Sequence, residues 1–333
     1  MIATFHSKLL RVADADVSWA GVFDPDTAKA QRFAAASGAR MCGSEIEVLE
    51  GCDAVYVCTW TAEHPVLVEA AAQRGLAVFC EKPLAVDLST ARRMAAIVDR
   101  AGVTNQVGLV LRRSPAFGLM RALASDPDSG RPMNIVFRDD QYIPIQGLYG
   151  STWRSDAMKA GSGTLLEHSI HDLDLLEWVL GPIVSVSARS ASFHGFDGIE
   201  DSMAVSLAFA NGAVGILSSV WHDILERPSQ RRVELFCEKA HVTLLGDWWG
   251  PVEWLVAGQA ARCADGAELE AEARGRGAVL GNPDKAFVEA VAAGTPAWPS
   301  FTEALRAHEL VDAVYRSAAA AGTPVHPPSR GCR

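Results

Sequence analysis

The stretch AVYVCTWTAEHPVLVEAAAQRGLAVFC, residues 54–80, decides the fold class of this chain. It begins with the continuous apolar run 54–58 and ends with another, 76–80, which is the pattern of strands buried on both faces. The segment 61–74 between them has the length of a helix and is followed by Gly75, a residue that favours a helix end. A strand, a helix and a second strand in this order predict a parallel βαβ unit.

Strand and helix alternate through the whole first third of the chain. The further predicted elements are a strand over 17–23, helices over 26–37, 44–50 and 88–101, and a strand over 106–111. Alternation of this kind predicts a Rossmann-type doubly wound parallel sheet. We therefore expect a dinucleotide-binding domain over residues 1–111.

The pattern changes over residues 112–333. The predicted elements there are a helix over 164–180, strands over 183–194, 202–210, 213–221, 232–237 and 241–245, and helices over 284–293 and 302–320. Asn211-Gly212 is a hairpin signal between two of these strands. We expect an α+β domain for substrate binding and oligomerisation, built on a mainly antiparallel open sheet, with a disordered tail from about residue 322.

Composition narrows the function classes. A length of 333 residues favours two domains, and a net charge of −10 argues against binding a nucleic-acid backbone. No apolar run is long enough to span a membrane, and no cationic and apolar leader pattern opens the chain. The seven cysteines show no CxxC pair or metal-ligand spacing, and Cys58 and Cys80 end apolar strand-like runs, as buried reduced thiols do. We expect a cytoplasmic protein that acts on a small molecule.

The segment CEKPLA, residues 80–85, carries the first candidate site. Lys82 directly follows a predicted buried strand, so it is expected at the carboxyl edge of the parallel sheet, where ligands bind. Partial desolvation there lowers the pKa of a lysine and makes it usable as an acid or as a hydroxyl-orienting group. The alternative is a solvated loop lysine.

The predicted helix 164–180 carries the second candidate site. At about 100° per residue, Glu167, His171 and Asp174 fall within one sector of about 60°. The apolar positions on the other side are Leu166, Leu173, Leu176 and Leu180. This pattern predicts an ionisable stripe that faces a cleft. The alternatives are a solvent-facing i,i+4 pair and a metal site that includes His168; since no further ligand is evident, we predict no metal.

Residues 61–87, TAEHPVLVEAAAQRGLAVFCEKPLAVD, resemble the core motif of the Gfo/Idh/MocA family of NAD(P)-dependent oxidoreductases. The similarity continues, in the family's order, through residues 108–117, 153–154, 161–181, 201–215 and 304–318. The resemblance therefore covers nearly the whole chain. It implies a two-domain enzyme that acts on sugars, polyols or related hydroxy compounds.

The resemblance also implies a role for each matching residue. Lys82 would orient or protonate the substrate oxygen, and His171 would take the hydroxyl proton, for which a reference pKa of about 6.5 is suitable. The implied substrate-binding residues are Glu167, Arg113, Arg154 and Asp174, and the implied cofactor-binding residues are Ile2, Ala3, Asp24, Thr59, Trp60, His64, Glu81 and Lys82. Glu167 stands where the family commonly has Asp. Surface ion pairs are the alternative for the two arginines, and plain packing is the alternative for Trp60.

The amino-terminal residues match the end of a dinucleotide fingerprint. Ala3, His6 and Leu10 have the family's spacing from the third small residue onward, and Asp24 comes about 20 residues later, where a ribose-binding acid is expected. A carboxylate at this position favours NAD over NADP, because it would repel a 2′-phosphate. The alternative role of Asp24 is to form a turn before Pro25.

This spacing puts Met1 inside the glycine loop of the fingerprint. We therefore expect the first strand and both leading glycines, about 10 residues, to precede Met1 in the natural product. That strand would lie between 17–23 and 54–58 in the sheet.

The sequence thus predicts an NAD(P)-dependent dehydrogenase that transfers a hydride between NAD(H) and a secondary alcohol. One alternative is a non-catalytic ligand-sensing or regulatory relative, which the presence of both Lys82 and His171 argues against. The other is a truncated product that does not bind cofactor. By analogy with such enzymes, we expect a homodimer or homotetramer formed through the C-terminal sheet.

Overall fold

The computed structural model describes residues 2–329, and the chain divides into two compact units. The first unit is Met1–Gly108 with Asn282–Leu305, and the second is Leu109–Gly281 with Arg306–Arg333. The domain boundary predicted from the sequence, between residues 111 and 112, put the segment 282–305 in the second domain, whereas the structure puts it in the first unit. The segment belongs to the first unit because Phe287 packs into one apolar cluster with Phe79.

The first unit contains a parallel sheet with the strand order β1-β2-β3. Its elements are α1 (Ile2–Val12), α2 (Thr27–Ser37), α3 (Glu45–Leu49), β1 (Ala54–Val57), η1 (Thr61–Glu63), α4 (His64–Ala72), β2 (Ala77–Cys80), α5 (Leu88–Ala101), β3 (Asn105–Val107) and α10 (Pro283–Ala293). The predicted parallel βαβ unit is confirmed as β1, α4 and β2. Gly75 follows α4 with φ of +72°, a conformation that glycine adopts without strain.

Two expectations for this unit were wrong. The run 17–23 is not a strand: within residues 2–329 its only ladder contact is an isolated parallel bridge from Val22 to Met41. The strand at 54–58 is not buried on both faces, since only Val57 of β1 is buried. Both results have one cause. A strand-like sequence becomes a buried strand only where neighbours pair with it on both sides, and β1 is an edge strand of the described sheet.

The second unit contains a sheet of eight strands in the order β11-β10-β9-β8-β4-β7-β6-β5. The strands are β4 (Pro132–Tyr142), β5 (Ile183–Ala191), β6 (Ser202–Phe209), β7 (Val214–His222), β8 (Gln230–Cys237), β9 (Ala240–Leu244), β10 (Val252–Val256) and β11 (Arg262–Ala264). All neighbours are antiparallel except β4 and β7, so the mainly antiparallel sheet is confirmed. The hairpin at Asn211-Gly212 joins β6 to β7.

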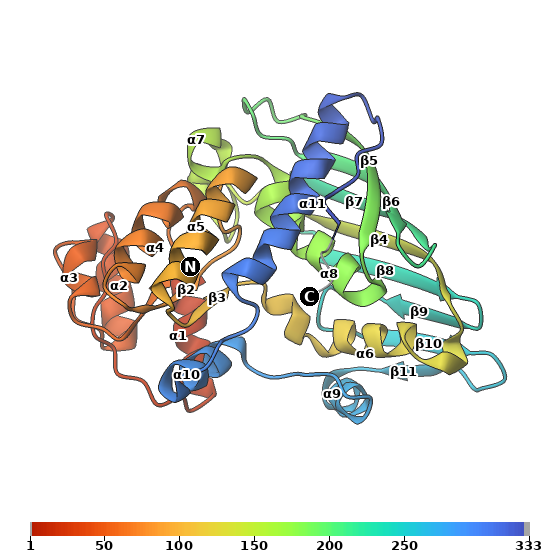
Figure 1. The fold of residues 1–333 in the computed structure, drawn as a ribbon, viewed down its shortest axis with the longest axis horizontal. Helices are drawn as coiled ribbons and strands as arrows, with labels where there is room; N and C mark the ends of the chain where they lie inside the picture. The colour runs from red at the N-terminus through yellow and green to blue at the C-terminus, as the bar shows by residue number, and fades with distance from the viewer. Residues whose placement is uncertain (1, 330–333) are drawn as a thin grey trace. The chain divides into compact units, whose positions relative to one another are not determined.

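Helices cover one face of this sheet (Figure 1). The helical elements of the unit are η2 (Val110–Arg113), α6 (Pro115–Ala124), η3 (Pro127–Ser129), η4 (Thr152–Ser155), α7 (Ala157–Ala160), η5 (Leu165–Ser169), α8 (Ile170–Leu180) and α9 (Gly266–Gly275); α11 (Phe301–Ala319) begins in the first unit and continues into the second. Burial alternates along β6 and β8, and their inner side chains pack with α6, α8 and α11 into one core.

The expected disordered tail is ordered up to residue 329. Val325 exchanges two backbone hydrogen bonds of 2.9 Å with Val186 on the edge strand β5. Arg306 donates to the Pro328 carbonyl at 2.7 Å. Unpaired backbone groups of an edge strand bind such a segment readily, a contact that composition alone does not show. The rest of the predicted tail, 330–333, lies outside the described residues.

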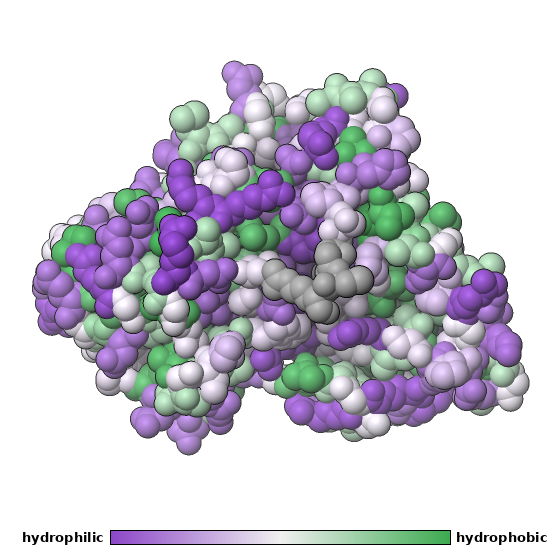
Figure 2. Space-filling model, in the orientation of Figure 1, coloured by the Kyte–Doolittle hydropathy of each residue, from purple (hydrophilic) through white to green (hydrophobic). Residues whose placement is uncertain are grey.

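The visible surface in Figure 2 mixes hydrophilic and hydrophobic residues. None of the helices within residues 2–329 has both the length and the apolar character needed to cross a membrane.

Candidate functional site

His64 ties together the loops that follow β1 and β2. Its Nδ1 lies 3.0 Å from the Pro83 carbonyl oxygen, and its Nε2 lies 3.3 Å from the Thr59 carbonyl oxygen. The imidazole is 1 % exposed. The structure therefore brings the predicted cofactor residues Thr59 and His64 to the segment that contains Lys82, at the carboxyl edge of the first sheet.

Glu81 holds the backbone at Lys82. Its Oε2 accepts a hydrogen bond of 3.0 Å from the Lys82 backbone N–H, and its carboxylate is buried. Gly108 leaves the space for it, because a Cβ at that position would come within 2.6 Å of the Glu81 carboxylate. The main chain at Lys82 is thus fixed by a buried acid, while Lys82 itself is half-buried.

A histidine between two acids neutralises Glu81. His6 Nε2 lies 2.8 Å from Glu81 Oε1, and His6 Nδ1 lies 2.6 Å from Asp284 Oδ1. Burial alone would lower the pKa of His6, but the hydrogen bonds to Asp284 and Glu81 outweigh it and raise the pKa to about 9. Burial alone would raise the pKa of Glu81, but the hydrogen bond to His6 outweighs burial and lowers the pKa of Glu81 below its ordinary value. His6 is therefore an imidazolium at neutral pH.

Sequence reasoning missed Asp284 as a partner of this site. Asp284 lies in the first turn of α10, 278 positions after His6. Acidic residues are common in the first turn of a helix because they stabilise the helix dipole, so Asp284 gave no sign of a role in a site. The one available signal was His6 itself, which has the family's spacing after Ala3.

Three other predicted cofactor residues lie at the starts of elements. Ile2 and Ala3 begin α1, and the half-buried Trp60 precedes η1. Asp24 Oδ1 accepts a hydrogen bond of 2.8 Å from the Asp26 backbone N–H, so the turn-forming role considered for Asp24 is present in the structure. A carboxylate has about four lone-pair sites, and this bond uses one of them.

In the second unit, the predicted helix 164–180 is not one uniform α-helix. It begins with the π-helical turn η5 and continues as α8, so the angular sector calculated for Glu167 and His171 was wrong. Every residue of α8 except Trp178 is buried, which also contradicts a stripe with one open face. π-Helical turns of this kind occur often at functional sites.

Glu200 caps the start of this turn. Its two carboxylate oxygens accept hydrogen bonds from the backbone N–H groups of Gly163 at 2.8 Å and Leu165 at 2.9 Å. A Cβ at position 163 would lie 1.8 Å from the Glu200 carbonyl oxygen, so only glycine allows this approach. Free N–H groups at the start of a helix are thereby satisfied by a buried acid.

Glu167 and Arg154, both predicted to bind substrate, form an ion pair. Arg154 Nε donates to Glu167 Oε2 at 2.9 Å, and its guanidinium lies 4.4 Å from the centre of the Trp153 ring. Glu167 is 2 % exposed and His171 is 8 % exposed. The alternative of a solvent-facing pair at these two positions is therefore wrong.

Asp174 has a partner that the sequence did not suggest. Arg112 donates to both of its carboxylate oxygens, with a distance of 2.7 Å from Nε to Oδ2. Both residues are buried. The pair ties α8 to η2, the turn that also carries the half-buried, predicted substrate residue Arg113.

Within residues 2–329, no group of three or more His, Cys, Asp or Glu side chains is arranged to hold a metal ion. His168, considered above as a ligand, instead lies 2.8 Å from Asp139 and 3.2 Å from the Arg231 guanidinium.

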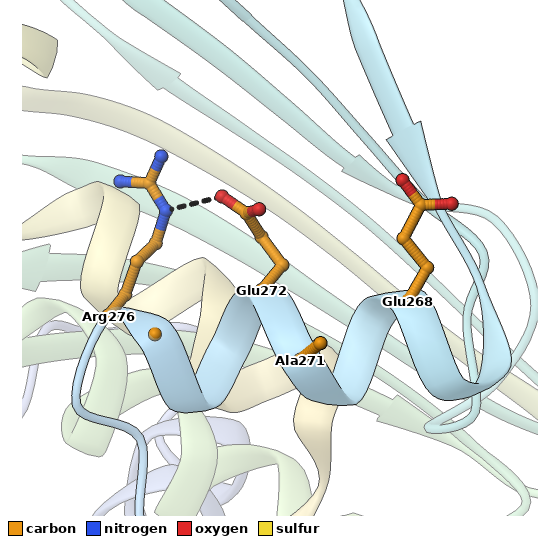
Figure 3. Close-up of a pocket in the computed structure, with 5 residues that line it drawn as sticks. Glu268, Ala271, Glu272 and Arg276 are labelled. Atoms are coloured by element: carbon orange, nitrogen blue, oxygen red, sulfur yellow. Dashed lines mark hydrogen bonds and ion pairs between the residues drawn. The ribbon is translucent and has the colours of Figure 1, made fainter.

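A surface pocket lies along the exposed side of α9 (Figure 3). Its lining residues are Glu268, Ala271, Glu272, Gly275 and Arg276, none of which was predicted to belong to a site. Arg276 Nε donates to Glu272 Oε1 at 2.9 Å, an i,i+4 pair of the kind common on helix surfaces. We assign this pocket no function.

Two family models match the chain. Residues 1–109 match a model described as an oxidoreductase family with an NAD-binding Rossmann fold, and residues 117–243 match the GFO/IDH/MocA C-terminal domain. The chain belongs to the Gfo/Idh/MocA oxidoreductase family. The predicted family and fold class are thereby confirmed.

Curated relatives of this Gfo/Idh/MocA protein include sugar and polyol enzymes. A 1,5-anhydro-D-fructose reductase from Ensifer adhaerens is 34 % identical over 166 residues, which are 49 % of this chain and 48 % of the relative. An inositol 2-dehydrogenase from Rhizobium meliloti (strain 1021) is 31 % identical over 226 residues, which are 66 % of this chain and 65 % of the relative. The matched part of the chain thus spans about half to two thirds of these relatives' length.

Solved structures with the same fold match over nearly the whole chain. A levoglucosan dehydrogenase in complex with NADH has a TM-score of 0.85 at 21 % identity and covers 99 % of this chain and 97 % of its own. An oxidoreductase domain protein from Kribbella flavida has a TM-score of 0.83 at 24 % identity and covers 97 % of this chain and 96 % of its own. At these identities the likeness shows the fold.

Proposed function

We propose that this protein is an NAD(H)-dependent dehydrogenase that oxidises a secondary alcohol of a sugar, a polyol or a related hydroxy compound. The observation that carries the proposal is the ion pair between the buried Glu167 on the π-helical turn and the half-buried Arg154 of η4, with His171 two residues after that turn on α8. Membership of the family and the activities named for its curated relatives support the same reaction class.

In this proposal the chain supplies the proton transfers and the orientation of substrate. His171 takes the proton of the hydroxyl that becomes a carbonyl, and the Lys82 ammonium donates a hydrogen bond to that oxygen. Glu167 accepts a hydrogen bond from a second hydroxyl, and Arg154 orients the Glu167 carboxylate. When bound, the nicotinamide accepts the hydride from the carbinol carbon.

The first unit offers a donor and acceptor set suitable for a nicotinamide dinucleotide. Asp24 retains acceptor sites for ribose hydroxyls besides the one used by Asp26, and the ring of Trp60 can stack on a flat heterocycle. We place the cofactor-binding role on these residues together with Ile2, Ala3, Thr59, His64, Glu81 and Lys82.

Steady-state rates over a panel of inositols, aldoses and other polyols, each with NAD and with NADP, test the proposal. We expect turnover with at least one polyol and a preference for NAD of at least about tenfold, the factor that ~1.4 kcal/mol of repulsion between Asp24 and a 2′-phosphate gives. Asp24→Ser should narrow that preference, and Asp16→Ser, which changes an exposed acid nearby in sequence, should not. Cofactor binding without turnover on any substrate would overturn the dehydrogenase assignment, and clear NADP preference would overturn the role of Asp24.

We further propose that the protein self-associates through the outer face of the large sheet. Exposed apolar side chains gather on that face, namely Val214 at 51 %, Ile216 at 49 %, Phe236 at 41 % and Leu255 at 46 % exposure. Side chains at these positions alternate with the buried ones of the core, so they share one face. Light scattering after gel filtration should give a dimer or tetramer, and Ile216→Lys should reduce the mass; a monomeric wild type would contradict this.

A further inference from the structure

A row of polar side chains crosses the inner face of the large sheet beneath α8. On three neighbouring strands, Asp139 of β4 pairs in register with Ser219 of β7 and with Arg231 of β8. All three are buried, at 0 %, 0 % and 4 % exposure. The next inner row consists of Leu217, Phe137 and Val233, as expected for a core. A charged row at this depth is costly unless every member is paired.

Each member of the row contacts the helix at a residue close to Glu167 or His171. Ser169 Oγ donates to Ser219 Oγ at 2.6 Å. His168 Nε2 lies 2.8 Å from Asp139 Oδ2, and Arg231 Nε donates to Asp172 Oδ1 at 2.8 Å. His168 directly follows Glu167 in sequence, and Asp172 directly follows His171. The row therefore anchors the backbone on both sides of the proposed base.

The charges of the cluster do not balance if all acids are ionised. The Arg231 guanidinium forms ion pairs with three carboxylates. Two belong to Asp139 and Asp172, and the third belongs to Asp247, to which Arg231 donates at 2.8 Å. Asp139 Oδ1 and Asp172 Oδ2 are buried and have no hydrogen-bond partner among the described residues, so with both acids ionised these two oxygens lack a donor. A hydrogen bond between two carboxyl groups requires one proton.

The surroundings of Asp172 favour this shared proton. Burial and the neighbouring Asp139 carboxylate raise the pKa of Asp172 to about 7, although Arg231 opposes the shift. The charged groups near the pair are Arg231 from β8, Asp247 from the segment after β9, His168 from η5 and, on the opposite face of β4, Asp140 with its partners Arg138 and Arg227. His168 Nε2 lies near both Asp139 and Arg231. When Nε2 carries a proton, it donates to the Asp139 carboxylate; when Nε2 is unprotonated, it accepts from the Arg231 guanidinium, which can only donate.

We propose that Asp139, Asp172, His168 and Arg231 are positioning residues that, through one shared proton, hold the π-helical turn with Glu167 and His171 in its working geometry. This inference rests on the proposed dehydrogenase function for its kinetic part. The shared proton itself is a property of the fold and is measurable without substrate.

Substitutions at position 172 separate positioning from plain stability. Asp172→Ala removes the bond to Arg231 and the proton proposed to be shared with Asp139, and we expect kcat to fall about 10- to 100-fold with KM within about twofold, because the base is displaced while Glu167 and Arg154 remain paired. Asp172→Asn should restore most of this loss, since its amide oxygen accepts from Arg231 and its NH2 donates to Asp139, as a protonated Asp does.

The matched control is Glu177→Gln on the same helix. This change weakens another buried ion pair of α8, in which Arg306 Nε lies 2.8 Å from Glu177. It should lower the melting temperature without changing kcat. Equal losses of kcat in Asp172→Ala and Glu177→Gln, or an Asp172→Asn protein no better than Asp172→Ala, would overturn the positioning role.

Thermal unfolding against pH tests the shared proton without activity. The folded pKa of about 7 lies above the ordinary 3.8, so the stabilisation by protonated Asp172 is present at low pH and is lost as the pH rises through about 7. The melting temperature of Asp172→Asn relative to wild type should therefore rise between about pH 5 and pH 8. A constant gap would refute the shared proton. A rising gap in a protein without turnover on any substrate would overturn the proposed function and leave the shared proton standing.

Discussion

Replacing His171 by alanine is expected to lower kcat by about 10²–10⁴-fold, the range that general-base catalysis contributes. The affinity for NAD should change little, because His171 belongs to the second unit and the residues assigned to the cofactor belong to the first. Single-turnover rates give the chemical step, and quenching of tryptophan fluorescence by the cofactor gives the affinity. Lys82→Ala should cause a loss of similar size, since it removes the proposed donor to the same substrate oxygen.

His241→Ala is the matched control for this experiment. His241 is half-buried on β9 and stacks on Phe236 at a ring distance of 4.5 Å, and no step of the proposed reaction uses it. Its replacement should leave kcat within about twofold, as is usual for residues outside the reacting groups. An unchanged kcat in His171→Ala would remove the assigned base, and the same result in Lys82→Ala would remove the assigned donor.

The parts of the fold that were predicted correctly are those whose signal is local. The apolar run 76–80 predicts a buried strand without any knowledge of its partners. The corresponding strand, β2, is indeed buried along its whole length. The strand β4 was missed because it lacks this local signal. Its residues 138–141 are Arg-Asp-Asp-Gln, and Asp139 occupies an inner position that is normally apolar. Only the pairing with Arg231 and His168, far away in sequence, makes an acid acceptable there.

The candidate site shows the same division. Lys82, Glu167 and His171 were named as candidates because they stand at recognisable positions of a motif, whereas their partners in the structure had no local signal. Arg112 and Asp174 are 62 residues apart in sequence, and Arg231 and Asp172 are 59 apart. The π-helical turn was also invisible, since a periodicity argument assumes about 100° per residue throughout.

Replacing His6 by leucine is the second change with a large expected effect. The substitution removes the cation between Glu81 and Asp284, which are 8 % and 0 % exposed, and leaves two buried acids without their common partner. Breaking a buried ion pair from one side costs about 3–5 kcal/mol in the free energy of unfolding. Denaturant unfolding at neutral pH measures this loss, and native-state hydrogen exchange of the β2 amides assigns it to the first unit.

The pH dependence distinguishes this charge effect from the loss of packing. The folded pKa of His6, about 9, lies above the ordinary 6.5, so the stabilisation is fully present below about pH 6.5 and is lost as the pH rises through 9. A shift of this size corresponds to ~3 kcal/mol. The difference in unfolding free energy between wild type and His6→Leu should therefore shrink by about that amount between pH 6 and pH 10. A difference that stays constant over this range would show that His6 acts as a packed ring and not as the imidazolium that neutralises Glu81 beside Lys82.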